Sequence, residues 1–209
     1  MFIEQRQVGQ MAVFAYLVGD EESGEALVID PAADTDGIIA AARDRQVRIR
    51  YIVNTHGHVD HIGGNEDMKA RTGADIIVHA DDAEMLTSTP AGMLRMFGAK
   101  ASPPADRTVT DGEVITVGGI ALKVIHTPGH SPGSMVLLLD GYAFTGDTLF
   151  VGAVGRTDLP GGSGEVMFES IQKRLCTLPD ETVVLPGHNY GSSPTSTIGQ
   201  EKKFNPFLR

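Results

Sequence analysis

The chain has 209 residues, 41% of them hydrophobic, which suffices for one domain with its own core over residues 1–209. Its formal net charge is −10 and its 17 Lys and Arg are scattered, so a nucleic-acid partner is not expected. There is no apolar run long enough for a membrane span, no secretory pattern at the N-terminus, and no second cysteine to pair with Cys176, so a cytoplasmic protein without membrane attachment is expected.

Short runs rich in β-branched residues recur along the chain, and each ends at a Gly, Pro, Asp or Asn signal, as strands do. The predicted strands span 12–18, 26–29, 51–54, 76–79, 121–125, 135–139, 142–145 and 182–185. Three helices are predicted. The first follows the capping residues 34–36 and ends at Arg45, and the others span 65–71 and 165–175. The last helix would bury a stripe of Met167, Ile171 and Leu175. This order indicates an α/β protein, and the pattern alone leaves open two facing sheets or a three-layer sandwich.

Four candidate metal ligands fall close together after the third predicted strand. The segment reads Thr-His-Gly-His-Val-Asp-His and contains His56, His58, Asp60 and His61. His56 and His58 project to one side of an extended chain, and Asp60 and His61 follow where the chain turns into a helix. Packed together without a metal, three imidazoles and a carboxylate would repel one another and lose hydration. The spacing therefore indicates a pair of metals that share one loop.

Three later strand ends supply further polar residues. His130 follows a Pro-Gly turn, Asp147 follows a glycine, and His188 follows another Pro-Gly turn. Ligands at the ends of several strands are typical of a rigid scaffold with a catalytic edge. His79 and His126 also end predicted strands, but each stands alone and is interpreted as an ordinary surface or hydrogen-bonded core residue.

Four ordered motifs resemble the metallo-β-lactamase superfamily over most of the chain: T-H-G-H-V-D-H, H-T-P-G-H-S-P-G, F-T-G-D-T-L-F and P-G-H-N-Y. The resemblance implies a four-layer αβ/βα sandwich, with two mixed β-sheets, helices on the outer faces and a metal site at one edge. It implies two divalent metal ions, zinc as the first expectation, with iron and manganese also suited to mixed His and carboxylate ligands. Carried over, one metal takes His56, His58 and His130, the other takes Asp60, His61 and His188, and Asp147 bridges them.

Two positions select a branch of the superfamily. True β-lactamases commonly lack a histidine where His61 stands, and the common zinc forms have a cysteine near Asp147. Here both positions, together with the Gly-Arg-Thr-Asp segment at 155–158 and the tail at 196–208, resemble short, single-domain hydrolases of the glyoxalase II (hydroxyacylglutathione hydrolase) type. The sequence stops before the helical domain that binds glutathione in full-length glyoxalase II, so specificity for glutathione thioesters is left open.

This resemblance implies a metal-dependent hydrolase that acts as a thioesterase on a small-molecule thioester, in the parent family one derived from glutathione. A hydroxide bridging the metals would attack the thioester carbonyl, and Asp60 would orient that hydroxide. Because a thiol pKa is about 8.5, a thiolate leaves without a dedicated general acid. The expected substrate-binding residues are Tyr190, Arg156 and Lys203.

Two other classes remain open. Persulfide dioxygenases carry a similar Gly-Arg-Thr-Asp segment and the same H-x-H-x-D-H string, yet the resemblance there implies a single Fe(II) held by His56, His130 and Asp147, with an open face for dioxygen. Because the other ligand residues survive in both classes, the sequence does not separate them. A non-enzymatic metal-binding module is the third class, and it would be expected to have lost at least one of the seven ligands, all of which are present.

Overall fold

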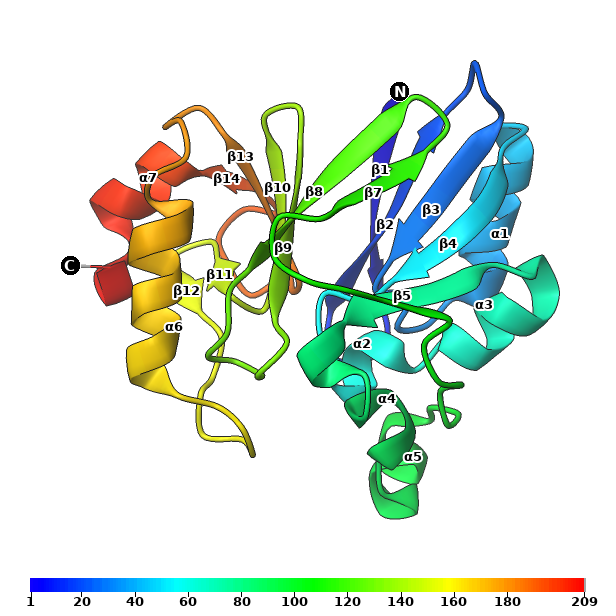
Figure 1. The fold of residues 1–209 in the computed structure, drawn as a ribbon, viewed down its shortest axis with the longest axis horizontal. Helices are drawn as coiled ribbons and strands as arrows, with labels where there is room; N and C mark the ends of the chain where they lie inside the picture. Colours follow the sequence, from blue (N-terminus) through cyan, green and yellow to red (C-terminus); the bar gives the residue numbers. More distant parts are fainter. Residues whose placement is uncertain (209) are drawn as a thin grey trace.

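Two six-stranded sheets face each other in the computed structural model, which describes residues 1–208 (Figure 1). The first sheet, in spatial order, consists of β1 (Phe2–Val8), β2 (Val13–Asp20), β3 (Glu25–Ile29), β4 (Arg48–Val53), β5 (Asp75–His79) and β6 (Arg107–Val109). The second, in spatial order, consists of β14 (Ser196–Thr197), β13 (Val183–Pro186), β10 (Tyr142–Gly146), β9 (Met135–Leu139), β8 (Ile120–His126) and β7 (Val114–Val117). A short ribbon pairs β11 (Leu149–Phe150) with β12 (Ala153–Val154).

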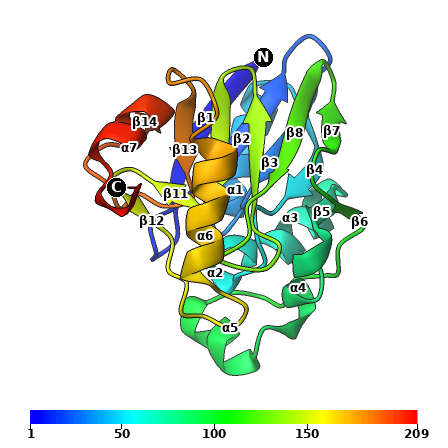
Figure 2. The same ribbon diagram turned by 60° about the vertical axis from the view of Figure 1, so that its left-hand side comes forward.

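Helices cover the outer face of each sheet, so the predicted four-layer sandwich with two mixed sheets is confirmed (Figures 1 and 2). The first sheet carries α1 (Thr35–Asp44) and α3 (Asn65–Thr72), and the second carries α6 (Gly164–Ser170) and α7 (Ile198–Phe204). Near one end of the sheets lie α2 (Val59–Ile62), α4 (Met85–Ser88) and α5 (Ala91–Phe97). None of the helices in the described part of the chain has the length and apolar character needed to cross a membrane.

Each interface between layers has its own apolar core. Tyr16 and Phe144 lie between the two sheets, and their rings meet edge to face at 5.1 Å. The predicted stripe of Met167, Ile171 and Leu175 is buried against the second sheet, although the helix changes from α to π geometry at Ile171. Side chains from both layers fill each core, which fixes the sheets and the helices relative to one another.

The eight predicted strands correspond to β2, β3, β4, β5, β8, β9, β10 and β13, which are all interior strands of the two sheets. The strands missed within these sheets are β1, β6, β7 and β14, the four sheet edges. An interior strand is buried on both faces and reads as an apolar run, whereas an edge strand is often short or polar. β14 has two residues, and β1 carries Glu4, Gln5, Arg6 and Gln7, so neither has an apolar run.

Several strands end at the same edge of the sandwich. In the first sheet β3, β4 and β5 run parallel, and in the second β10 and β13 do so. β8 runs in the direction of β10, because each pairs antiparallel with β9 between them. The two sheets are tied together here, since Phe14 N donates to Gly187 O at 2.8 Å and Met135 N donates to Thr55 O at 2.9 Å. The loops that leave these strands are therefore held on a rigid frame.

Candidate metal centre

The structure brings all seven predicted ligands to this common edge. His56 and His58 lie on the loop after β4, and Asp60 and His61 lie on α2, which follows directly. The remaining three come from the second sheet, one from each of the loops that follow β8, β10 and β13: His130, Asp147 and His188. The centre thus lies between the two sheets and draws on both.

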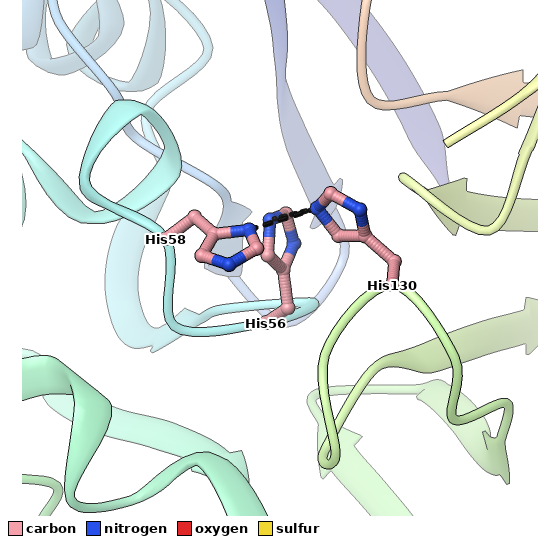
Figure 3. A group of neighbouring side chains, drawn as sticks. All are labelled: His56, His58 and His130. Atoms are coloured by element: carbon pink, nitrogen blue, oxygen red, sulfur yellow. Dashed lines mark hydrogen bonds between the residues drawn. The ribbon is translucent and has the colours of Figure 1, made fainter. Parts of the chain in front are cut away.

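Three imidazoles point toward one another on one side of the centre (Figure 3). The Nε2 atom of His130 lies 3.2 Å from His56 Nε2 and 2.8 Å from His58 Nδ1. Around a tetrahedral zinc ion with bonds of about 2.0–2.1 Å, neighbouring ligand atoms lie about 3.3 Å apart. The three nitrogens therefore have nearly the spacing that one ion requires.

A second group of three ligands lies beside the first. His61 Nε2 and His188 Nε2 are 3.1 Å apart, and Asp60 Oδ2 lies 3.5 Å from His188 Nε2 and 3.9 Å from His61 Nε2. Both histidines are at most 2% exposed, whereas Asp60 remains partly exposed. This group could hold a second ion with one side turned toward solvent.

Asp147 lies between the two groups. Its Oδ2 atom is 3.5 Å from His130 Nε2 and 3.3 Å from His188 Nε2, and its Oδ1 atom is 3.2 Å from His61 Nε2. Oδ1 is buried, and it accepts no hydrogen bond from the residues that the structure describes. A buried carboxylate oxygen without a donor needs a cation, so this position fits a carboxylate that bridges two metals.

Hydrogen bonds on the far side of three rings leave the Nε2 atoms free to bind metal. His130 Nδ1 donates to Arg156 O at 2.7 Å, and His188 Nδ1 donates to Met11 O at 2.8 Å. In His61, Nδ1 lies 3.0 Å from a carboxylate oxygen of Asp30. Because these acceptors hold the proton on Nδ1, the neutral form of each ring has its lone pair on Nε2, directed into the centre. The residues present therefore fit metal ions.

The electrostatics of the centre also favour a bound cation. Burial and the neighbouring imidazoles lower the pKa of His56 well below its usual value and that of His58 to about 4, so both are neutral and able to bind metal. Burial also lowers the pKa of His61, but the nearby carboxylates of Asp147 and Asp30 have the larger effect and raise this pKa well above its usual value. Burial alone would raise the pKa of Asp147, but its contacts with His61 and His188 lower that pKa well below the usual range. The ionised carboxylates thus attract positive charge to this side of the centre, and a metal ion supplies it.

Asp30 is a functional residue that the sequence analysis missed. It follows β3 in a left-handed conformation, with φ of 48°, and is 1% exposed. Besides its contact with His61, it accepts hydrogen bonds from Thr55 N at 2.8 Å and Thr55 Oγ1 at 2.6 Å. It thereby orients one ligand and the start of the ligand loop. A single aspartate after a strand usually marks a turn, so its position at a strand end was the only signal.

Asp82, which follows β5, was missed for the same reason. It is fully buried and accepts hydrogen bonds from Gly57 N at 2.8 Å, Ser131 Oγ at 2.7 Å and Gly133 N at 2.6 Å. Gly57 lies between two ligands of the first loop, and Ser131 follows His130. One carboxylate therefore fixes the separation of the two loops that carry the first group of ligands.

His79 and His126 lie outside the centre, as the sequence analysis supposed. Their rings stack at 4.0 Å with an interplanar angle of 11°. His126 Nε2 donates to Pro132 O at 2.8 Å. Asp81 Oδ2 lies 3.6 Å from His79 Nδ1 and 3.8 Å from His126 Nε2, so these three side chains form a separate polar cluster.

A cavity of about 400 Å³ opens beside the centre. Of the three expected substrate-binding residues, Tyr190 and Arg156 line it, whereas Lys203 lies on α7 and is not among its lining residues. Tyr190 stacks on His188 with ring centroids 4.4 Å apart. The Arg156 guanidinium donates to both carboxylate oxygens of Asp158 at 2.7 Å, and this contact lowers the pKa of Asp158 to about 2. Arg156 is thus already paired.

Residues 8–188 match the family model described as "Metallo-beta-lactamase superfamily". The chain belongs to this superfamily of metal-dependent enzymes. It is 34% identical to hydroxyacylglutathione hydrolase GloC of Haemophilus influenzae over 200 residues, covering 92% of this chain and 91% of that protein. It is also 34% identical to the mitochondrial persulfide dioxygenase ETHE1 of Homo sapiens over 203 residues, covering 93% of this chain and 71% of that protein.

Two solved structures resemble the whole fold. The crystal structure of the BLEG-1 B3 metallo-beta-lactamase gives a TM-score of 0.89 at 34% identity and covers 99% of both chains. TTHA1623 in a di-iron-bound form gives a TM-score of 0.86 at 32% identity and covers 98% of this chain and all of that one. The sandwich is therefore shared with proteins whose names denote different reactions.

Proposed function

We propose that the protein is a dinuclear metal-dependent hydrolase of thioesters. The observation that carries this proposal is the presence of two complete ligand groups with Asp147 between them. Because the same ligand residues survive in persulfide dioxygenases, the metal content and the reaction itself separate the two candidates. The likeness to GloC, whose name denotes hydrolysis of a glutathione thioester, supports the same reaction class.

Ions bound in such a pair lower the pKa of water toward about 7 and polarise a carbonyl. The chain's own residues supply the rest. Asp60 both lines the cavity and lies 3.5 Å from His188 Nε2, so its carboxylate could hold a metal ion and orient an attacking water molecule. Because a thiol has a pKa of about 8.5, a thiolate departs without a general acid. Tyr190 also lines the cavity, and burial raises the pKa of its hydroxyl, so this side chain stays protonated.

The test is release of free thiol from thioesters by protein loaded separately with zinc, iron or manganese. We expect turnover that Asp60→Asn lowers at least tenfold, since this variant keeps the shape of the side chain but removes the negative charge that a metal ligand supplies. A β-lactam is the matched alternative substrate, because the same carbonyl chemistry would open it and BLEG-1 carries that name. Hydrolysis of the β-lactam without any thioester turnover would contradict the proposal.

A persulfide dioxygenase is the second candidate, and the identity with human ETHE1 favours it. The three residues that such a site would use are close together, since His130 Nε2 lies 3.2 Å from His56 Nε2 and 3.5 Å from Asp147 Oδ2. His188→Gln separates the candidates because His188 belongs only to the other ligand group. A dinuclear hydrolase should lose activity with this change. An iron-loaded dioxygenase should still consume oxygen with glutathione persulfide.

A further inference from the structure

Part of the wall of the cavity is apolar. It is formed by Met93 and Phe97 of α5, Met11 of the turn between β1 and β2, Phe150 of β11, and Leu159. A small-molecule site usually combines such a wall with a few polar groups that fix orientation. Here the polar groups gather at the metal centre, so the wall is free to select the rest of the substrate.

A smaller cavity of about 160 Å³ adjoins the first. The two cavities share Met11, Val59, Asp60 and Phe97, so the metal centre opens onto both. The rest of the smaller cavity is mainly apolar and is lined by Gly9, Gln10, Val13, Ala32, Ala33, Met96 and Ala99. A methylene group is about the size of a water molecule, which takes up about 30 Å³ in the liquid. The smaller cavity therefore has room for about five methylene groups.

The charges in these cavities do not favour an anionic carrier. Among the lining residues of both cavities in the described chain, Arg156 is the only cationic side chain apart from histidine, and Asp158 already neutralises it. The acidic residues there, Asp60 and Asp147, belong to the centre. Each carboxylate of a glutathione carrier would therefore lack an unpaired arginine or lysine among these residues.

The helix that forms the wall is itself loosely held. None of the residues of α5 is buried, and Met96 is 70% exposed. Both ribbon views show α5 projecting from the end of the sandwich (Figures 1 and 2). An apolar ligand would cover side chains that water now contacts, and this burial is favourable.

We propose that the substrate is a thioester with an unbranched apolar acyl group of about six carbons on a carrier that need not be charged. The acyl chain occupies the smaller cavity between Met11, Val59 and Phe97, and the thioester carbonyl lies over the metal centre. This inference rests on the proposed thioesterase function and specifies its substrate class.

The test compares acetyl, butanoyl, hexanoyl and octanoyl thioesters on N-acetylcysteamine, a neutral thiol, and on glutathione, with the metal-loaded protein. Burial of a methylene is worth about fourfold in kcat/KM, so the value should rise at least tenfold from acetyl to hexanoyl. The glutathione carrier should change kcat/KM by less than about threefold.

Variants at the smaller cavity provide the second arm. Ala99→Leu should fill it, and Phe97→Ala should remove its shared wall, so each should lower the ratio of kcat/KM for the hexanoyl substrate to kcat/KM for the acetyl substrate at least threefold. Phe204→Ala is the matched control, since Phe204 is 63% exposed on α7 and lines neither cavity. It should leave the chain-length profile unchanged.

The outcomes separate this inference from the function on which it rests. A preference for acetyl or lactoyl glutathione, or an equal loss for all chain lengths in both cavity variants, would overturn the apolar acyl site and leave a thioesterase. Failure to hydrolyse any thioester on either carrier would overturn the proposed function and the inference together.

Discussion

The two sides of the cavity are built in opposite ways. On the ligand side, His56 and His61 are at most 1% exposed, and their loops are fixed to strand ends by buried carboxylates. On the other side, α5 has no buried residue, and its Met96 is 70% exposed. The ligand side is thus buried within the sandwich, whereas α5 lies on its surface.

This difference explains how one metal centre can serve several reactions. Changing a residue of the ligand side disturbs buried hydrogen bonds and the ion sites together. Changing a residue of α5 alters only what the cavity accepts. The names of GloC, ETHE1 and BLEG-1 denote three different reactions on chains that are 34% identical to this one. The fold and the overall level of identity therefore do not fix the reaction.

The largest effect is expected at Asp147, which both ligand groups share. Replacing a residue that orients a ligand typically costs 10–100-fold, so Asp147→Ala should lower activity by more than about 100-fold. Elemental analysis should show that bound metal falls as well. A variant that keeps two metals per chain and full activity would refute the bridging position.

A smaller loss is expected at Asp30, which touches no substrate and acts through His61. Asp30→Asn keeps the shape and tolerates the left-handed backbone, but it removes the charge that holds the proton on His61 Nδ1. Metal affinity and activity should fall about 10–100-fold. Added metal should restore much of the activity, whereas loss that excess metal does not reverse would point to a purely structural role.

A stability effect is expected at Asp82, for which the chain offers a matched control. Asp82→Asn leaves buried donors poorly satisfied and should lower the free energy of unfolding by about 1–3 kcal/mol. Asp81→Asn changes an exposed neighbour and should stay within about 0.5 kcal/mol. Urea unfolding of both variants gives the comparison, and equal stabilities would show that Asp82 does not brace the loops.

The smallest effect is a difference in motion that needs no mutation. Amides of α5 should exchange with deuterium much faster than those of β4 and β5, because α5 is not held by buried contacts. A bound hexanoyl substrate analogue should slow exchange in α5 and leave the strands unchanged. Equal protection of α5 and the strands in the free protein would remove the contrast between the two sides.

The sequence pointed to the candidate ligands because four of them lie within one short segment. The segment 56–61 contains His56, His58, Asp60 and His61. Histidines and an aspartate at this spacing have few roles other than binding metal. The interior strands were found for a related reason, since burial on both faces leaves an apolar run. Among the four sheet edges that were missed, β1, β6 and β14 are polar or short, whereas β7 is a short β-branched run whose positions alternate between exposed and buried.

The residues that support the ligands and the residues of the substrate side could not be predicted in the same way. Asp30 and Asp82 act through partners far away in the chain, and a single aspartate carries no local signature of that role. The segment 91–97 has no buried face, so no periodic pattern marked it as a helix. Arg156 was expected to hold a carboxylate of the substrate, but its pairing with Asp158 appears only in three dimensions.

The most direct test of the central claim is the metal content of protein purified without chelator and without added metal. Two complete ligand groups that share Asp147 predict about two metal ions per chain by elemental analysis. About one iron per chain and little else would contradict the dinuclear centre, and oxygen consumption with glutathione persulfide would then become the reaction to measure.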